Sequence, residues 1–243
     1  MWAGTRPTSA FSRSAASTTS GVALVRVTGK GRTASIEAEE LAELRARFAT
    51  TAVDVGTGDG RFAYHLATAD PGRLVIGIDA LDEPMGEIAA KAARKPAKGG
   101  RENLLLIRAA IETLPPELEH LADEVSVQLP WGSLLEGIVL ARDDMLGGLA
   151  SLCRSGARVV VTLNGEIWLD STPARYEHLP VPTPEYVDTV VAAGFARVGI
   201  RLEPARYSSA AEAKALPTTW ARRLGHGRAH PSFVQFEGVC SGE

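Results

Sequence analysis

The sequence has 243 residues, of which 45% are hydrophobic and 23% charged, and its formal net charge is −3. This composition is ordinary for a soluble globular protein with one sizeable core, and the net charge alone does not indicate a nucleic-acid-binding protein. No apolar run is long enough for a transmembrane helix. The two cysteines, Cys153 and Cys240, form neither a metal-binding pattern nor a disulfide framework. We therefore expect buried thiols in a cytoplasmic protein.

The N-terminal segment differs in composition from the rest of the chain. Residues 1–21 are rich in Ser, Thr, Ala and Gly, and the first acidic residue is Glu37. Arg6 and Arg13 give a faint similarity to a transit peptide, but the continuous apolar core of a secretory signal is missing. We expect residues 1–21 to be a disordered extension and residues 22–243 to form a single domain.

A β-hairpin and a helix are predicted next. Residues 22–27 alternate loosely in polarity, and the turn at Gly29-Lys30-Gly31 favours pairing with residues 33–36. Ser35 is placed to cap a helix over residues 37–48, whose apolar side chains share one face.

Residues 52–60, with the sequence Ala-Val-Asp-Val-Gly-Thr-Gly-Asp-Gly, carry the strongest functional signal. A buried strand ends here in a glycine-rich turn, and residues 61–69 follow with helical spacing of apolar side chains. The glycines permit positive φ and a close approach of ligand to backbone. The helix N-terminus offers unpaired N–H groups. This pattern predicts a cofactor site.

The acids in and after this turn help to choose between a dinucleotide and S-adenosylmethionine. Asp54 and Asp59 would repel a pyrophosphate, whereas the methionine end of S-adenosylmethionine carries an ammonium and a sulfonium group. The next strand, residues 73–78, leads to Asp79, about where an acid holds ribose hydroxyls. S-adenosylmethionine is favoured, and a nicotinamide-dependent oxidoreductase remains the alternative.

Strands and helices alternate through the rest of the chain, which predicts an α/β fold with a mostly parallel sheet and helices on both faces. The two last strands fit an antiparallel edge. Ligands in such sheets bind at the carboxyl ends of the strands, which brings Asp54, Asp79, residues 110–112 and residues 129–131 to one crevice. The expected strands are 73–78, 103–107, 124–129, 157–163, 196–203 and 232–239; the expected helices are 84–95, 116–121, 146–153 and 184–193, with 164–183 irregular.

Two segments at this crevice suggest how a base is held. Glu112 follows the third strand, where its carboxylate or the backbone of Ala110 and Ile111 would meet an adenine amino group. Amino-group methyltransferases usually carry Asn or Asp, then Pro-Pro and an aromatic residue, after the fourth strand. Here Leu129-Pro130-Trp131 gives no side-chain acceptor, so a flat ring would be held by stacking and by backbone carbonyls.

Two basic clusters interrupt the otherwise acidic chain. Charge runs are usually solvated faces, but two runs, one joined to a tryptophan, are more typical of phosphate contacts. The first cluster has helical spacing at Lys91, Arg94, Lys95 and Lys98 and continues to Arg101; the second joins Trp220 to Arg222, Arg223, His226, Arg228 and His230.

With these motifs assembled, the chain resembles the aminoglycoside-resistance methyltransferases that modify N1 of adenine 1408 in 16S rRNA, the kanamycin–apramycin resistance family. The resemblance runs from about residue 22 to residue 238. It is carried by Asp54-Val-Gly-Thr-Gly-Asp-Gly60, Ile76-Gly-Ile-Asp79, Lys95-Pro-Ala-Lys-Gly-Gly100, Leu129-Pro-Trp-Gly132 with Leu134-Leu-Glu136, and Trp220-Ala-Arg-Arg-Leu224 with Gly227-Arg228.

The resemblance implies a class I, Rossmann-like methyltransferase fold with a seven-stranded sheet. It implies that Trp131 and Trp220, beside Pro130, clamp a flipped adenine, and that His230 stands where an Arg is expected. It places the S-adenosylmethionine pocket at Asp54, Gly56, Thr57, Gly58, Asp79, Ala110, Ile111, Glu112 and Leu129. It places the rRNA backbone at Lys91, Arg94, Lys95, Lys98, Arg222, Arg223 and Arg228.

The chemistry expected at such a site is positioning. Adenine N1 has an in-plane lone pair and the sulfonium methyl is already electrophilic, so neither a metal nor a nucleophilic side chain is required. Because the basic residues lie on distant segments, we expect the substrate to be the assembled 30S subunit, bound by a monomer. The alternatives are a tRNA or small-molecule methyltransferase on the same fold, and a non-catalytic ribosome-binding protein.

Overall fold

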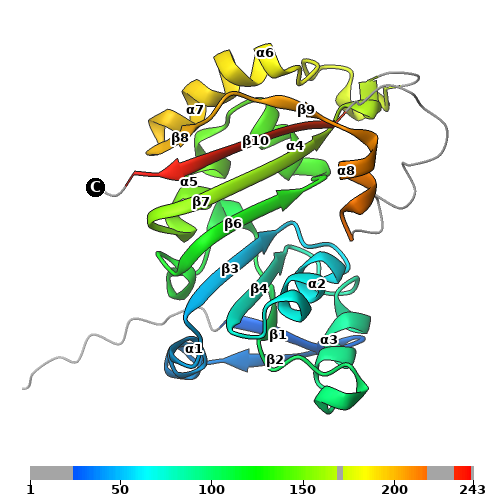
Figure 1. Ribbon diagram of the computed structural model, residues 1–243, viewed down its shortest axis with the longest axis vertical. Coiled ribbons are helices and arrows are strands. Elements are labelled where there is room, and N and C mark those ends of the chain that lie inside the picture. The colour runs from blue at the N-terminus through cyan, green and yellow to red at the C-terminus, as the bar shows by residue number, and fades with distance from the viewer. Residues whose placement is uncertain (1–23, 169–171, 218–232, 242–243) are drawn as a thin grey trace, which may run out of the picture.

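One mixed sheet with helices on both faces makes up the computed structural model, which describes residues 24–168, 172–217 and 233–241 (Figure 1). The strands are β1 Leu24–Gly29, β2 Arg32–Ile36, β3 Thr50–Val55, β4 Arg73–Asp79, β5 Leu104–Arg108, β6 Ala122–Gln128, β7 Cys153–Asn164, β8 Ile200–Leu202, β9 Arg206–Ser208 and β10 Phe233–Cys240. The α-helices are α1 Ala38–Ala46, α2 Arg61–Ala69, α3 Gly86–Ala92, α4 Gly132–Val139, α5 Asp143–Leu152, α6 Pro184–Tyr186, α7 Ala192–Arg197 and α8 Ala210–Ala215.

The strand order is that of a doubly wound sheet. It runs β2-β1-β5-β4-β3-β6-β7-β10-β8, and β9 also pairs with β10. Strands β5, β4, β3, β6 and β7 are parallel, while β10 is antiparallel to both β7 and β8. The β1–β2 hairpin extends the sheet beyond β5, to which β1 pairs antiparallel. The α/β prediction, with its antiparallel C-terminal edge and N-terminal hairpin, is confirmed.

The order reverses at β3, which sets the place of the ligand crevice. From β3 the chain passes to β4 and β5 on one side, and then crosses to β6 on the other. Connections therefore leave β3 and β6 in opposite directions, and a crevice opens at their carboxyl ends.

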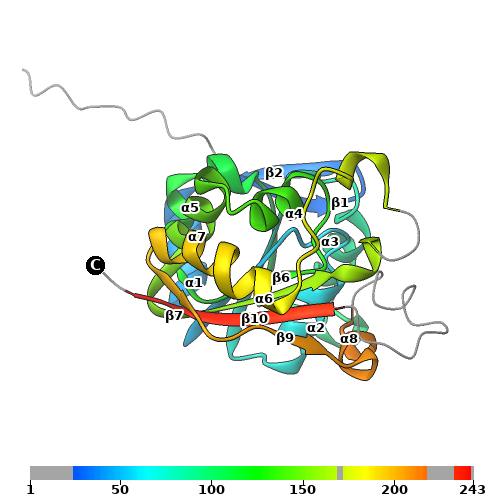
Figure 2. The ribbon, with the colours of Figure 1, turned by 90° about the horizontal axis from the view of Figure 1, so that it is seen from above.

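Alternate residues of β4 and β5 face two separate apolar cores, as the period of a strand requires. On one face Val53 and Val125 belong to a large cluster that also holds Leu41 of α1 and the buried side of α4 and α5. On the other face Val75 and Leu104 pack with α2 and α3. Seen from above, α4 to α7 lie on one side of β7 and β10, and α2 and α8 lie on the other (Figure 2).

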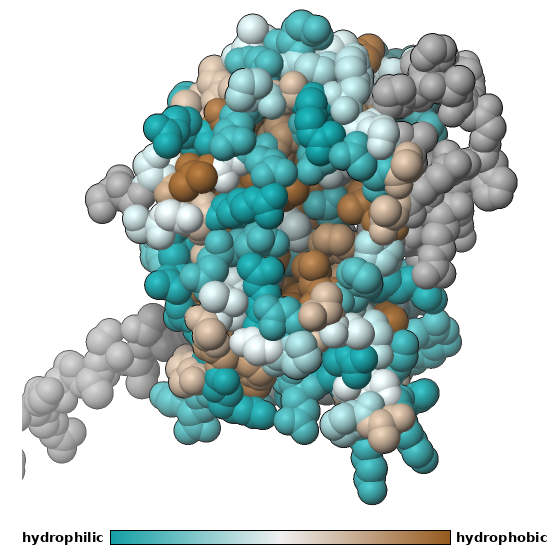
Figure 3. Space-filling view, viewed as in Figure 1, coloured by the Kyte–Doolittle hydropathy of each residue, from teal (hydrophilic) through white to brown (hydrophobic). Residues whose placement is uncertain are grey.

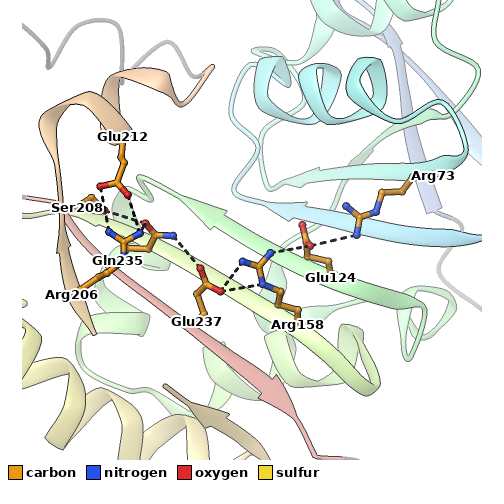
Figure 4. A network of polar contacts seen from close by, with 8 residues as sticks. All are labelled: Arg73, Glu124, Arg158, Arg206, Ser208, Glu212, Gln235 and Glu237. Atoms are coloured by element: carbon orange, nitrogen blue, oxygen red, sulfur yellow. Dashed lines mark hydrogen bonds and ion pairs between the residues drawn. The ribbon is translucent and has the colours of Figure 1, made fainter. Parts of the chain in front are cut away.

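Helices α2 and α3 cover only the β3–β4–β5 half of their face. Across β6, β7 and β10 the same face carries polar side chains, which dominate the surface on this side of the molecule (Figure 3). Hydrogen bonds and ion pairs there join Arg73, Glu124, Arg158, Glu237, Gln235, Ser208, Arg206 and Glu212 in one chain (Figure 4).

Several predicted elements differ from the structure. Ser35 lies in β2 and does not cap α1, which begins after Glu37 without a side-chain cap. Residues 116–121 form only a short 3₁₀ turn, Pro116–Leu118, and strand β6 begins already at Ala122. The predicted strand 196–203 begins inside α7, and only Ile200–Leu202 pairs in the sheet.

Helix α4 was not predicted. Most of its side chains are buried, including Leu134, Leu135 and Ile138, so it lacks the polar stripe that marks a surface helix. It packs closely on α5: a Cβ at Gly137 would lie 2.6 Å from Cγ of Met145.

No helix in the described ranges has both the length and the apolarity that crossing a membrane requires.

Candidate active site and cofactor pocket

A pocket of about 590 Å³ opens at the carboxyl ends of β3, β4 and β6 and under the loop after β5. Its volume lies within the range of small-molecule sites. The lining includes every residue predicted for the cofactor and the described part of the predicted base clamp: Asp54, Gly56, Thr57, Gly58, Asp79, Ala110, Ile111, Glu112, Leu129, Pro130 and Trp131. Leu134, from the Leu134-Leu-Glu136 motif, also lines it, as do Phe62 and Arg175, for which the sequence predicted no role.

The glycine turn has a backbone conformation that residues other than glycine rarely adopt. Gly56, Gly58 and Gly60 have φ values of 69°, 58° and 78°, in the region that favours glycine. The backbone N–H of Gly56 donates to the carbonyl oxygen of Ile78 at 2.9 Å. A Cβ at Gly56 would lie 2.5 Å from Cδ2 of Leu134, so any side chain there would force the Leu134 side chain to move.

Asp54, at the end of β3, is the most perturbed acid of the pocket. Its side chain is 2% exposed. The Thr57 hydroxyl donates to Oδ2 at 2.6 Å and the Ser126 hydroxyl donates to Oδ1 at 3.2 Å. Burial raises the pKa of Asp54 from 3.8 to about 7, the two hydrogen bonds oppose that shift, and Asp79 and Asp59 add to it. A cation in this pocket would therefore strongly favour the ionised form of Asp54.

Asp79 and Glu112 are two further acids that line the pocket. The Asp79 carboxylate accepts the N–H of Gly58 at 2.9 Å and that of Leu81 at 3.0 Å, one on each oxygen. Each oxygen keeps a further acceptor site for a ligand hydroxyl. Glu112 lies on the 3₁₀ turn Ile111–Thr113 that follows β5 and is partly exposed to the pocket.

Trp131 stands at the rim, directly before α4. Leu129 has a φ of 53°, and its N–H donates to Thr162, which turns the chain sharply away from β6. The N–H of Gly132 donates to the Tyr176 hydroxyl at 2.8 Å, and the rings of Trp131 and Tyr176 have centroids 5.9 Å apart. Tyr176 is fully buried and comes from the stretch predicted to be irregular.

The first basic cluster forms a compact loop between α3 and β5. The Lys91 ammonium lies 4.0 Å from the centroid of the Tyr64 ring, whose hydroxyl donates to the Gly99 carbonyl. Lys91 is therefore partly buried against Tyr64, whereas the next three basic residues are exposed to solvent. Arg94, Lys95 and Lys98 are exposed and make no ion pair with any residue that the structure describes, whereas most other described arginines do.

The second cluster lies outside the described residues. It comprises Trp220, Arg222, Arg223, His226, Arg228 and His230, so of the two tryptophans predicted to hold the base the structure places only Trp131.

Comparison with known proteins agrees with this geometry. The family described as NpmA: 16S rRNA (adenine(1408)-N(1))-methyltransferase matches residues 25–239. The chain belongs to this family. A 16S rRNA (adenine(1408)-N(1))-methyltransferase of Streptoalloteichus hindustanus is 44% identical over 203 residues, which are 84% of this chain and 93% of the relative.

Solved structures of the adenine-1408 methyltransferase family have the same fold. The 16S rRNA methyltransferase KamB superposes with a TM-score of 0.82 at 41% identity, over 90% of this chain and 100% of that one. A point mutant of the enzyme from Catenulisporales acidiphilia, solved with its cosubstrate SAM, has a TM-score of 0.80 at 38% identity, over 90% of this chain and 98% of that one. Family membership therefore excludes the nicotinamide-dependent alternative.

The residues of the pocket fit S-adenosylmethionine, the cosubstrate of this adenine-1408 methyltransferase family. The buried Asp54 carboxylate suits an ammonium group, and the turn at Gly56 leaves the backbone open to a ligand. Asp79 retains acceptor sites for ribose hydroxyls. Ala109, Ala110 and Ile111 offer an apolar wall for an adenine ring, with Glu112 at its edge.

Proposed function

We propose that this protein methylates N1 of adenine 1408 in 16S rRNA within the assembled 30S subunit, and so gives resistance to aminoglycosides of the kanamycin and apramycin type. The observation that carries the proposal is one arrangement: the acidic glycine-turn pocket opens directly beside Trp131. Its support comes from the family, whose match covers residues 25–239 and so includes both the pocket and the rim.

The residues of the pocket would hold the methyl donor in place. Asp54 would pair with its amino group, Asp79 with the ribose, and Glu112 with the adenine edge. Bound S-adenosylmethionine supplies a methyl group on a sulfonium; the adenine N1 lone pair attacks it, and the C–S bonding electrons return to sulfur. Within the described residues no side chain at the rim is placed as a base, and N1 attack needs none.

Trp131 would form one side of the base clamp and Trp220 the other. An extruded base is commonly held between aromatic faces, and stacking contributes about 1–3 kcal/mol per base. The methyl transfer moves positive charge onto the purine, and an indole face stabilises a nearby cation by roughly 0.5–2 kcal/mol. Catalysis would then consist of alignment and of this electrostatic contribution.

The cation-rich loop at residues 94–98 would contact the rRNA backbone. Arg94, Lys95 and Lys98 are exposed and have no acidic partner in the described part of the chain, so phosphates would meet no competing carboxylate. Phosphate contacts give register without reading sequence. Such a surface fits a rigid ribosomal particle in the cytoplasm, bound by a single copy of the chain.

Methyl transfer to intact subunits tests the proposal. Purified protein is incubated with labelled S-adenosylmethionine and either intact 30S subunits, naked 16S rRNA or bulk tRNA. We expect label in the intact subunits, much less in naked rRNA, and none in tRNA. Equal rates on subunits and naked rRNA would refute the requirement for the assembled particle, and labelled tRNA would favour the alternative acceptor.

A further inference from the structure

Ser126, on β6, lies beside Asp54 in the sheet. The two residues are paired in register across the parallel β3–β6 ladder, so their side chains leave the same face. Their neighbours Val125 and Val127 point to the opposite face and belong to the large apolar core. Ser126 is 4% exposed, and a small polar side chain at this point of a buried strand needs a polar partner.

The Asp54 carboxylate is that partner. The Ser126 hydroxyl has one proton and two acceptors within reach, the Val53 carbonyl at 3.5 Å and Oδ1 of Asp54 at 3.2 Å. The carboxylate contact is shorter and involves the group that carries charge, so it is the stronger of the two. Thr57 donates to the other oxygen, Oδ2.

Two hydroxyls, one on each oxygen, fix the plane of the carboxylate. An ionised carboxylate has about four acceptor sites, so two remain after these bonds. Asp54 lines the cofactor pocket, whereas Ser126 does not, so Ser126 would reach a ligand only through Asp54. Ser126 would therefore position the Asp54 oxygen that contacts the ligand, without contacting the ligand itself.

We propose that Ser126 is a positioning residue for cofactor binding, which with Thr57 aims the Asp54 carboxylate at the amino group of the bound methyl donor. This inference rests on the proposed pairing of Asp54 with that amino group. Ser126 also borders a separate polar cavity of about 200 Å³ between β6, β7, β10 and α8. Its replacement by alanine leaves the apolar core of the opposite face untouched.

A dependence on pH follows from the charges around Asp54. The pKa of Asp54 is raised to about 7: burial is the largest cause, the hydrogen bonds from Thr57 and Ser126 oppose the shift, and Asp79 at the end of β4 and Asp59 in the glycine turn add to it. Loss of the Ser126 donor would move the titration of Asp54 upward. As the pH falls, the affinity for a cationic ligand would then be lost at a higher pH than in the wild type.

The experiment compares two probes that differ at the amino-acid end. S-adenosylhomocysteine has the ammonium group, and 5′-deoxy-5′-methylthioadenosine lacks the whole amino-acid portion. Their dissociation constants are measured by calorimetry between pH 6 and 7.5, where the ligand's own α-amino group stays protonated. The variants are Ser126→Ala, Ser126→Thr, and the control Thr162→Val, which removes a buried hydroxyl from the same cavity without touching Asp54.

We expect Ser126→Ala to weaken the binding of S-adenosylhomocysteine roughly tenfold at pH 7, because a hydrogen bond to a charged group is lost. The pH at which half of the affinity is lost should also move upward. Methylthioadenosine should bind as in the wild type, Ser126→Thr should restore affinity, and Thr162→Val should be neutral. Equal loss for both probes, or no loss for either, would overturn the proposal. Normal probe binding by the wild type with no transfer to 30S subunits would instead overturn the proposed function and leave Ser126 untouched.

Discussion

The ring of Tyr176 lies 5.9 Å from the ring of Trp131, centroid to centroid, with 48° between their planes. The Tyr176 hydroxyl also accepts the N–H of Gly132, the first residue of α4. One buried side chain therefore fixes both the orientation of the rim tryptophan and the start of the helix behind it. The Trp131 side of the proposed base clamp is preorganised by this contact.

Tyr176→Phe tests that preorganisation. The variant keeps the ring but removes the acceptor for Gly132, which should cost about 1–3 kcal/mol of folding stability and reduce the rate of methyl transfer more than the affinity for S-adenosylmethionine. The control is Tyr186→Phe, which removes a hydroxyl bonded to the carbonyl of Val139 at the other end of α4. Turnover with intact subunits and urea unfolding are measured. A similar loss of turnover in both variants would show that Tyr176 only stabilises the fold.

Trp220→Ala tests the second half of the clamp. We expect loss of aminoglycoside resistance in cells, with the dissociation constant for S-adenosylmethionine changed little, because the residue would contact the base and not the donor. Resistance is read as growth on kanamycin and apramycin, and cofactor affinity by calorimetry. Retained resistance would mean that the late tryptophan has only a packing role.

Charge reversal at Lys95 and Lys98 tests the basic loop. Each lost phosphate contact should reduce the slope of log affinity against log salt by roughly 0.7–0.9, so the double variant Lys95→Glu, Lys98→Glu should bind 30S subunits weakly and with a flatter salt dependence. The control is Arg201→Glu, an exposed charge on β8 at the far end of the sheet (Figure 1). Unchanged subunit binding in the double variant would remove this loop from the interface.

Asp54→Asn tests how much folding stability the ligand-free protein loses by burying the ionised Asp54 carboxylate. Unfolded Asp54 ionises near its ordinary pKa of 3.8 and the folded residue near 7, so between these values the folded state holds more protons and its stability falls as pH rises. The neutral variant avoids this cost. Its gain in unfolding free energy over the wild type should be about 2–3 kcal/mol larger at pH 8 than at pH 5. Urea unfolding of both proteins at the two pH values measures the difference; a gain that is independent of pH would contradict the raised pKa.

Much of the pocket could be predicted because its residues are close together in sequence. The segment from Asp54 to Gly60 carries a strand, a turn and a helix start in one run, and Asp79 follows the next strand. Local periodicity and glycine placement are sufficient for such a motif. The same reasoning located Glu112 and Trp131, each directly after a strand, at the pocket that the structure shows.

The supporting residues could not be predicted, because their roles arise only from tertiary contact. Ser126 meets Asp54 across the sheet, and Tyr176 reaches Gly132 from a segment without regular periodicity. The alternation of Glu124, Ser126 and Gln128 with valines was the one available signal, since a central parallel strand is normally apolar on both faces. Ser35 shows how a local signal can mislead. It is a favourable helix-capping residue, but in the structure it pairs with β1 as part of strand β2.

Primer extension through the decoding site is the most direct test of the central claim that N1 of adenine 1408 is the acceptor. Intact 30S subunits are treated with the protein and S-adenosylmethionine, and the extracted rRNA is copied by reverse transcriptase. A methyl group on N1 blocks Watson–Crick pairing, so a new stop at adenine 1408 is predicted, absent without the donor and absent with Trp220→Ala. Unimpeded extension through that adenine, or a stop at a different base, would contradict the account.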